Sequence, residues 1–326
     1  MKKIFSIIAI VVLGALIGSC SGANIEKDNK AKVIRINISD TIASCIQQTM
    51  QMEQFLEKYL PGGVTAEWTN IAATPDIRDA IATNRIDIGS FSIASYISSI
   101  ENGMPLVALS GTLPLTNELV TTRSGISSFS DINEQHSIVM LSRGSSAELA
   151  FSLRCKEVFG NAAVFSQNIV VIPNAEMAAM IQGNDDYDLY APAFPFLQKM
   201  ADLENVKVVE GLSETAVKYG IGSILVTSED FYKNNPELIE AFQKASLDTV
   251  RHLKENTEEA AQKLAWLYGD EVMPEDVAAV LKRCPPELRI TSYDIIADLL
   301  YEMGILSEPA MKFHELPYYS ETLNDQ

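Results

Sequence analysis

Hydrophobic residues in the first part of the chain switch repeatedly between the spacing of a strand and that of a helix. Short apolar runs such as VIRINI at 33–38 are followed by longer segments in which apolar residues recur every three or four positions. Thr74 as N-cap and Pro75 at the first position suit the start of a helix. The pattern predicts strands at 33–38, 64–68, 86–89 and 105–112 and helices at 41–59, 74–83 and 92–100. This alternation favours a mainly parallel sheet covered on both faces.

A second α/β unit follows between about 118 and 212. The pattern there predicts strands at 117–123, 137–141, 168–173, 188–192 and 206–210, and helices at 146–159, 175–182 and 195–203. A strand resumes at 219–227, and the chain is then helical to its end. Asn235 is expected to cap a helix that begins at Pro236.

The first twenty residues form a separate segment. Lys2 and Lys3 precede an apolar run at 4–17 that is shorter than the roughly 20 residues of a membrane-spanning helix, which predicts a secretory signal at 1–19. The ending Ile17-Gly18-Ser19-Cys20 resembles the lipobox of bacterial lipoproteins, which implies cleavage before Cys20 and lipidation of its thiol. The alternative is an ordinary signal peptide with a chance cysteine. Residues 20–31 are expected to form the lipidated cysteine and a flexible tether.

Charge and chemistry exclude several classes of function. The 326 residues include 43 acidic and 25 basic ones, a net charge of −18, which disfavours nucleic-acid binding. An anionic small ligand is still possible, because local backbone amides outweigh distant charge. The other cysteines and the three histidines are scattered, so we expect buried thiols, no metal site and no cofactor. We find no motif of a catalytic site and therefore expect no catalytic residues.

Three stretches carry a resemblance to a known family. They are NRIDIGSFSIASYISSIENGMPLVALSG at 84–111, GISSFSDINEQHSIVMLSRGSSAELAF at 125–151 and EDFYKNNPELIEAFQKASLDTVRHLKENTEEAAQKLA at 229–265. Their order resembles extracytoplasmic solute-binding lipoproteins of ABC importers, and more narrowly the nitrate/sulfonate/taurine and thiamine-precursor (NMT1/THI5-like) group. The segment NEQHSIVM departs from the usual Lys/Gly-rich turn of the family.

The resemblance implies a fold and a function. The fold is α/β, a bilobal periplasmic-binding-protein type II fold with two hinge crossovers and a helical C-terminal region. Lobe 1 would comprise 32–115 and 220–326, and lobe 2 would comprise 116–219. The protein would be a monomer outside a bacterial membrane, held by lipid on Cys20, that captures a sulfonate, nitrate or pyrimidine-like solute for an ABC permease and its ATPase. A ligand-sensing lipoprotein coupled to a receptor, and a pyrimidine-synthesis-like enzyme on the same fold, are the alternatives.

The ligand is expected at the junctions where strands lead into helices, since helix N-termini present free N–H groups and partial positive charge. In the SRGSS loop, Arg143 either pairs with an anionic group or lies in solvent. Asp40 either caps its helix or binds an amine, and the aromatic residues either line the cleft or belong to the core. The candidate ligand-binding residues are Ser39, Asp40, Ser90, Phe91, Ser92, Ser110, Gly111, Ser142, Arg143, Gly144, Ser145, Ser146, Asn174, Tyr190 and Phe194.

Overall fold

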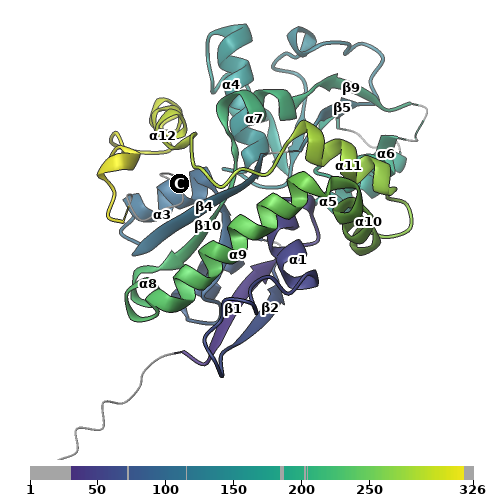
Figure 1. The fold of residues 1–326 in the computed structure, drawn as a ribbon. Coiled ribbons are helices and arrows are strands. Elements are labelled where there is room, and N and C mark those ends of the chain that lie inside the picture. Colours follow the sequence, from purple (N-terminus) through teal and green to yellow (C-terminus); the bar gives the residue numbers. More distant parts are fainter. Residues whose placement is uncertain are drawn as a thin grey trace, which may run out of the picture. The chain divides into compact units, whose positions relative to one another are not determined.

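The computed structural model of the protein describes residues 31–71, 73–114, 116–183, 187–201, 203 and 205–318 (Figure 1). The predicted signal peptide, Cys20 and all but the last residue of the predicted tether lie outside the described residues. Within the described ranges, no helix combines the length and the apolar character needed to cross a membrane.

The first sheet has five strands in the order β2-β1-β3-β10-β4. Its strands are β1 (Val33–Ile38), β2 (Thr65–Asn70), β3 (Ile88–Ser92), β4 (Leu106–Pro114) and β10 (Gly222–Ser228). Strands β2, β1 and β3 are parallel, whereas β10 is antiparallel to both β3 and β4. The prediction of a mainly parallel sheet is therefore wrong in detail, because a late strand inserts in the opposite direction between two early ones.

The second sheet also has five strands, in the order β7-β6-β8-β5-β9. Its strands are β5 (Leu119–Thr121), β6 (Ile138–Met140), β7 (Ile169–Val171), β8 (Leu189–Tyr190) and β9 (Lys207–Glu210). Strand β6 is parallel to β7 and β8, and β5 is antiparallel to β8 and β9. The chain passes from one sheet to the other after β4 and returns before β10, so it forms two α/β lobes with two crossovers.

Helices cover both sheets, and α9 runs across the first one (Figure 1). The α-helices are α1 (Cys45–Met52), α2 (Thr74–Ala82), α3 (Ile93–Glu101), α4 (Ser146–Phe159), α5 (Asn174–Gln182), α6 (Phe196–Ala201), α7 (Leu212–Tyr219), α8 (Glu229–Asn234), α9 (Pro236–Glu255), α10 (Thr257–Tyr268), α11 (Pro274–Arg283) and α12 (Tyr293–Glu302). Short 3₁₀ helices lie at Ile42–Ser44, Phe129–Asp131, Ser166–Asn168 and Phe313–Glu315. The predicted helical C-terminal region is confirmed.

The helices of the structure differ from the predicted pattern in two places. The helix expected over 41–59 begins as a 3₁₀ turn and ends at Met52, and Gln54 then adopts a positive φ of 52° that no α-helix accommodates. Residues 212–219, for which the sequence pattern predicted no helix, form helix α7 in the connection between β9 and β10. Apolar spacing alone therefore extended one helix and overlooked another.

The predicted helix starts also need correction. Ala73 occupies the N-cap position of α2, so Thr74 lies in its first turn. Asn235 occupies the N-cap position of α9, as predicted, but its side chain makes no capping hydrogen bond. Instead, its Oδ1 accepts a hydrogen bond from the backbone N–H of Ala31 at 3.0 Å, and its Nδ2 donates to the carbonyl of Phe231 at 3.2 Å. The side chain thus fastens the start of the described chain to α8.

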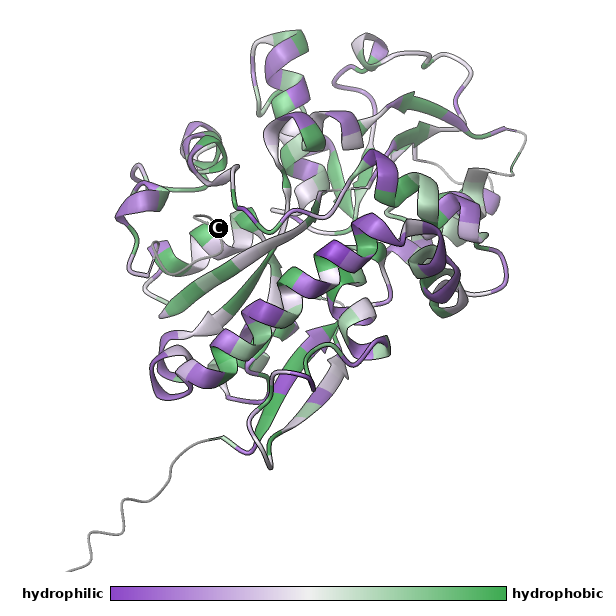
Figure 2. Cartoon of the chain, viewed as in Figure 1, coloured by the Kyte–Doolittle hydropathy of each residue, from purple (hydrophilic) through white to green (hydrophobic). Residues whose placement is uncertain are grey.

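Both faces of the first sheet are buried. On β10, Ile224 and Val226 belong to one hydrophobic cluster and Leu225 to another on the opposite face. Alternate residues of a strand point to opposite faces, so this pattern places helices on both sides. Figure 2 shows hydrophobic residues concentrated on the strands, with hydrophilic and hydrophobic positions interleaved along α9. The core holds the strand ends, and hence the loops beyond them, in fixed positions.

Cys45, Cys155 and Cys284 are buried, as the sequence predicted, and no disulfide joins them in the described part of the chain. We expect Cys45 and Cys155 to resist thiol reagents in the native protein, because burial raises the pKa of each thiol to about 12 and removes the reactive thiolate. Labelling with a maleimide, followed by peptide mapping, should modify them only after denaturation in guanidinium chloride. Rapid labelling of either residue without denaturant would contradict this prediction.

Candidate ligand-binding site

A cavity of about 140 Å³ lies between strand ends of both sheets and is called the central cavity below. A cavity of roughly 10–15 Å³ holds one water molecule. The central cavity is about ten times larger and is therefore large enough for a small organic solute. Its lining consists of Asn37, Ser39, Thr41, Ala43, Ser44, Thr74, Ile77, Ser90, Ser92, Asn117, Leu141, Ser142, Ser145, Ser146, Ala147, Asn174, Ala193 and Ser223.

The central cavity gathers seven of the residues that the sequence singled out. They are Ser39, Ser90, Ser92, Ser142, Ser145, Ser146 and Asn174. Ser90 is the middle residue of β3, and the other six lie at or just beyond the carboxyl ends of β1, β3, β6 and β7. In an open α/β sheet these ends meet at one edge, which is why residues far apart in the chain converge here.

No charged side chain lines the central cavity, and helix N-termini are the source of positive charge nearest to it. Helices α2, α3, α4 and α5 all begin at lining residues, and each helix N-terminus contributes free N–H groups and about half a positive charge. Ser92 and Ser145 cap two of these helices, accepting hydrogen bonds from the N–H groups of Ser95 at 3.2 Å and Glu148 at 3.3 Å. Neutral hydroxyl and amide donors around this field suit a small oxyanion.

Asn37 is a lining residue that the sequence did not single out. It is only 1% exposed, and its Nδ2 donates to the carbonyls of Ile38 at 2.8 Å and Ile71 at 2.9 Å. Its Oδ1 accepts from the N–H of Ser90 at 3.4 Å. Asn37 therefore positions the ends of β1 and β2 relative to the middle of β3. The signal available in the sequence was an uncharged polar residue within the otherwise largely apolar run VIRINI.

Two serines tie the α4 side of the central cavity to the first sheet. Ser92 Oγ donates to the carbonyl oxygen of Gly144 at 2.8 Å, and Ser146 Oγ donates to the carbonyl oxygen of Gly222 at 3.2 Å. Each bond joins residues of different lobes. The lobes are thus in contact around the cavity, which limits its access to solvent.

Arg143 does not line the central cavity, although Ser142 and Ser145 do. Its guanidinium binds Glu148 Oε1 at 2.8 Å and donates to the carbonyl of Ser166 at 2.7 Å. Glu148 is 1% exposed, and its Oε2 accepts the N–H of Gly144 at 2.5 Å. Burial raises the pKa of Glu148, while the Gly144 N–H and the charge of Arg143 oppose that rise. Arg143 thus compensates a buried carboxylate. Gly144 itself has a φ of 68°, which favours glycine.

Six other candidates also lie outside the lining. Asp40 is exposed and accepts a hydrogen bond from Asn70 Nδ2 at 2.5 Å. Phe91, Tyr190 and Phe194 are each at most 1% exposed and belong to hydrophobic clusters. The other two are Ser110, which is buried, and Gly111, which packs against the C-terminal region.

We expect Arg143→Gln to lower stability more than solute affinity. The substitution removes the cation beside the buried Glu148 carboxylate, but Arg143 is itself 45% exposed, so the loss should be about 1–2 kcal/mol. Thermal unfolding measures this loss, with the exposed Arg85→Gln as a matched control. A large loss of solute affinity at unchanged stability would instead place Arg143 in the ligand site.

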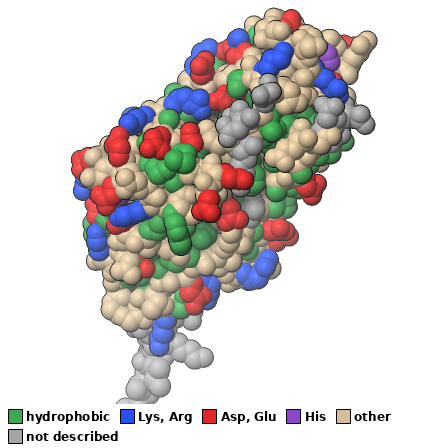
Figure 3. Space-filling model, turned by 90° about the vertical axis from the view of Figure 1, so that its right-hand side faces the viewer, with side chains coloured by type: hydrophobic (Ala, Val, Ile, Leu, Met, Phe, Trp, Pro, Cys, Tyr) green, Lys and Arg blue, Asp and Glu red, His purple; other side chains and the backbone are tan. Residues whose placement is uncertain are grey.

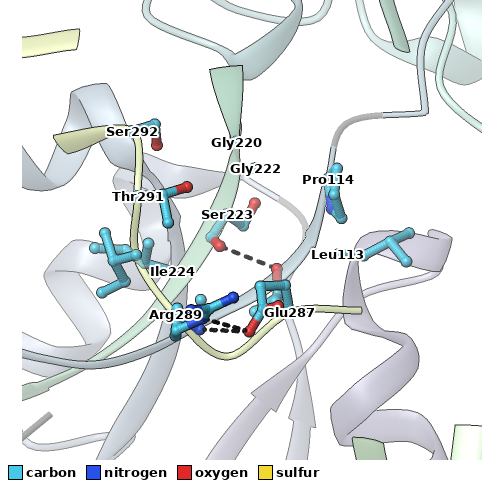
Figure 4. Close-up of a pocket in the computed structure, with 13 residues that line it drawn as sticks. Leu113, Pro114, Gly220, Gly222, Ser223, Ile224, Glu287, Arg289, Thr291 and Ser292 are labelled. Carbon is cyan, nitrogen blue, oxygen red and sulfur yellow. Dashed lines mark hydrogen bonds and ion pairs between the residues drawn. The ribbon is translucent and has the colours of Figure 1, made fainter. Parts of the chain in front are cut away.

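Residues 284–292 form the linker between α11 and α12 and pack against β4, the strand that precedes the first crossover (Figure 4). The N–H of Gly111 donates to the carbonyl of Leu288 at 2.6 Å, and the N–H of Glu287 donates to the carbonyl of Thr112 at 2.8 Å. Thr112 Oγ1 in turn donates to the carbonyl of Ser223 at 3.0 Å, which joins β4 to β10. This linker therefore fixes one side of the hinge.

Two α/β lobes, two crossovers and a polar cavity at the strand ends define a periplasmic-binding-protein fold. Residues 63–260 match the model of the family described as NMT1/THI5 like, which is more than half of the chain. The chain therefore belongs to this family, and the predicted group is confirmed. No curated protein sequence matches the chain.

Solved structures share the fold at low sequence identity. The alkanesulfonate-binding protein SsuA from Xanthomonas axonopodis pv. citri bound to MOPS is 15% identical, with a TM-score of 0.71 over 86% of this chain and 96% of that one. A zinc-bound ligand-binding component of an ABC-type import system from Staphylococcus aureus is 17% identical, with a TM-score of 0.72 over 90% and 100%. The periplasmic nitrate-binding protein NrtA from Synechocystis PCC 6803 is 14% identical, with a TM-score of 0.59 over 78% and 70%. All three are named as binding proteins rather than enzymes, and they confirm the predicted bilobal fold.

Proposed function

We propose that the protein is the extracytoplasmic solute-binding component of an ABC importer. It captures a small oxyanion, of the sulfonate or nitrate kind, between lobe 1 (32–115 and 220–326) and lobe 2 (116–219). It acts as a monomer and delivers the solute to a permease driven by a cytoplasmic ATPase. Membership of the NMT1/THI5-like family and the bilobal fold support this role.

Four helix N-termini converge on the central cavity, and none of its lining residues is charged. This arrangement favours an oxyanion as the solute. A permanently ionised sulfonate or nitrate needs several hydrogen-bond donors, and hydroxyls with helix N–H groups supply them. A cation would meet the positive ends of the same helices. A neutral pyrimidine would gain less from their field than an anion, because its carbonyl oxygens carry only partial charge.

Titration of the ligand-free protein with a matched series of solutes tests this proposal. Ethanesulfonate and nitrate should raise the melting temperature in proportion to the logarithm of concentration, as binding to the folded state requires. Ethylammonium and ethanol should leave it unchanged. Calorimetry then gives the affinities. Stabilisation by uracil alone, or by ethylammonium alone, would overturn the choice of an oxyanion.

We propose that lipid on Cys20 holds the protein at the outer side of the cytoplasmic membrane or at the cell surface. The sequence Ile17-Gly18-Ser19-Cys20 and the polar stretch after it support this anchor. One acyl chain binds a membrane only marginally, so more than one is needed for stable attachment. In cells, the wild type should incorporate labelled palmitate and Cys20→Ala should not. Equal labelling of both proteins would contradict the assignment.

A further inference from the structure

A second cavity, of about 370 Å³, lies between the second sheet and helix α11 and shares no lining residue with the central cavity. It is called the lateral cavity below. Glu118, Gln198 and Glu214 contribute oxygen atoms to its lining from three different segments, and Arg283 contributes from α11. Phe194, a candidate for the central site, lines this cavity instead.

The lateral cavity contains two buried acceptors that lack a donor. Glu118 is 4% exposed, and its Oε1 accepts the hydroxyl of Ser213 at 2.7 Å and binds Arg283 at 2.9 Å. Its other oxygen, Oε2, has no hydrogen-bond partner among the described residues, and the same holds for Gln198 Oε1. A buried acceptor without a donor costs roughly 1–3 kcal/mol, so this arrangement favours a ligand that brings donors.

Access to Glu118 Oε2 depends on a glycine. A Cβ atom at Gly211 would lie 3.2 Å from Oε2 and 3.4 Å from Glu214 Cγ. The absence of that atom leaves room beside both carboxylates. Glu214 also raises the pKa of Glu118 by like-charge repulsion, in addition to the larger effect of burial. Two carboxylates therefore face the same small space.

The charges and the walls restrict the class of ligand. Glu118, Glu214 and Arg283 together carry one net negative charge, which a monocation balances. Arg283, already bound to Glu118, disfavours a divalent metal ion, and no group of three His, Cys, Asp or Glu side chains suited to a metal occurs in the described ranges. The side chains of Leu197, Val208 and Val280 supply an apolar wall. Figure 3 shows the side of the molecule that carries α6, α11 and β9, where acidic side chains lie beside hydrophobic ones.

We propose that the lateral cavity binds a small organic primary ammonium ion, with its –NH₃⁺ group donating to Glu118 Oε2 and Gln198 Oε1 and its alkyl part against the apolar wall. An ammonium group has three donors and no acceptor, which matches the unpartnered oxygens. Thr116, Glu118 and Gln198 belong to the lobe of the second sheet, whereas Val280 and Arg283 belong to α11. Occupancy of the site therefore bridges that lobe and the C-terminal region.

Ligand-observed NMR and calorimetry with butylammonium chloride test this assignment on the full mature protein. Butylammonium should bind with a dissociation constant in the millimolar range, and butanol, which has the same chain without the charge, should bind at least tenfold more weakly. Ammonium chloride should also bind more weakly, because it lacks the alkyl part. Absence of butylammonium binding, or equal binding of butanol, would overturn the proposal.

Two variants locate the bound ion. Glu118→Gln should weaken butylammonium binding at least tenfold, and Gln198→Met, which keeps the length but removes the acceptor and leaves the Arg283 ion pair intact, should weaken it severalfold. Glu176→Gln, an exposed substitution on α5, is the matched control and should have no effect. If both Glu118→Gln and Gln198→Met bind butylammonium like the wild type, the ion is elsewhere and the proposal fails. Binding of ethanesulfonate in the central cavity is a separate readout, so failure of one proposal does not imply failure of the other.

Discussion

Gly111→Ala is expected to destabilise the protein by roughly 3 kcal/mol and to lower its melting temperature by roughly 6–10 °C. A Cβ atom at this position would lie 2.7 Å from the carbonyl oxygen of Glu287 and 2.9 Å from that of Arg289. Both are backbone atoms of the 284–292 linker and cannot rotate away. The substitution must therefore separate β4 from the linker and break the 2.6 Å hydrogen bond from Gly111 to Leu288.

Differential scanning calorimetry of Gly111→Ala beside Gly125→Ala measures the effect. Gly125 is exposed, and a Cβ atom there would have no neighbour within 4 Å, so its replacement should change stability by less than about 0.5 kcal/mol. Equal melting temperatures for wild type and Gly111→Ala would contradict the prediction, because they would show that the linker is not in close contact with β4 in solution.

Ser90→Asp is expected to abolish oxyanion binding in the central cavity. Ser90, the middle residue of β3, lines the cavity, and its N–H donates to Asn37 Oδ1. A carboxylate placed about 4 Å from a bound anion, at an effective dielectric constant of about 20, costs about 4 kcal/mol. This energy corresponds to a loss of affinity of roughly a thousandfold.

The matched control is Ser90→Asn, which has nearly the same shape as Ser90→Asp but no charge. The ratio of the two affinities for ethanesulfonate, measured by calorimetry, isolates the electrostatic effect. Circular dichroism and melting temperature show whether either variant is misfolded. If Ser90→Asp and Ser90→Asn bind ethanesulfonate equally well, the ligand is not in this cavity.

Four of the seven candidate residues that line the central cavity lie at helix starts, which local sequence controls: Ser92, Ser145, Ser146 and Asn174. Ser145 and Ser146 follow a short apolar run and precede a helical pattern, and Ser92 occupies the same kind of junction. Hydroxyl residues favour the N-cap, and strand ends of an α/β sheet meet at one edge. These rules operate over a few residues and required no tertiary contacts.

Arg143 shows where local rules were insufficient. The sequence left open whether this side chain meets a ligand or solvent, and the structure gives it a third role beside the buried Glu148. Tyr190 and Phe194 were equally undecided, because an aromatic residue after a strand suits a cleft wall and a core alike. Their burial depends on distant partners, such as Tyr268, whose ring centroid lies 5.8 Å from that of Phe194.

By itself, the sequence determined the class of fold, the order of nearly all its elements and the serine-rich junctions, because hydrophobic spacing and helix-start preferences act locally. Tertiary structure alone decided the antiparallel insertion of β10, which brings Ser223 to the central cavity, and the role of Asn37 across three strands. It also decided the close contact of Gly111 with the 284–292 linker and the two unpartnered oxygens of the lateral cavity. Each of these depends on segments that are far apart in the chain, whose contacts are set by packing rather than by neighbouring residues.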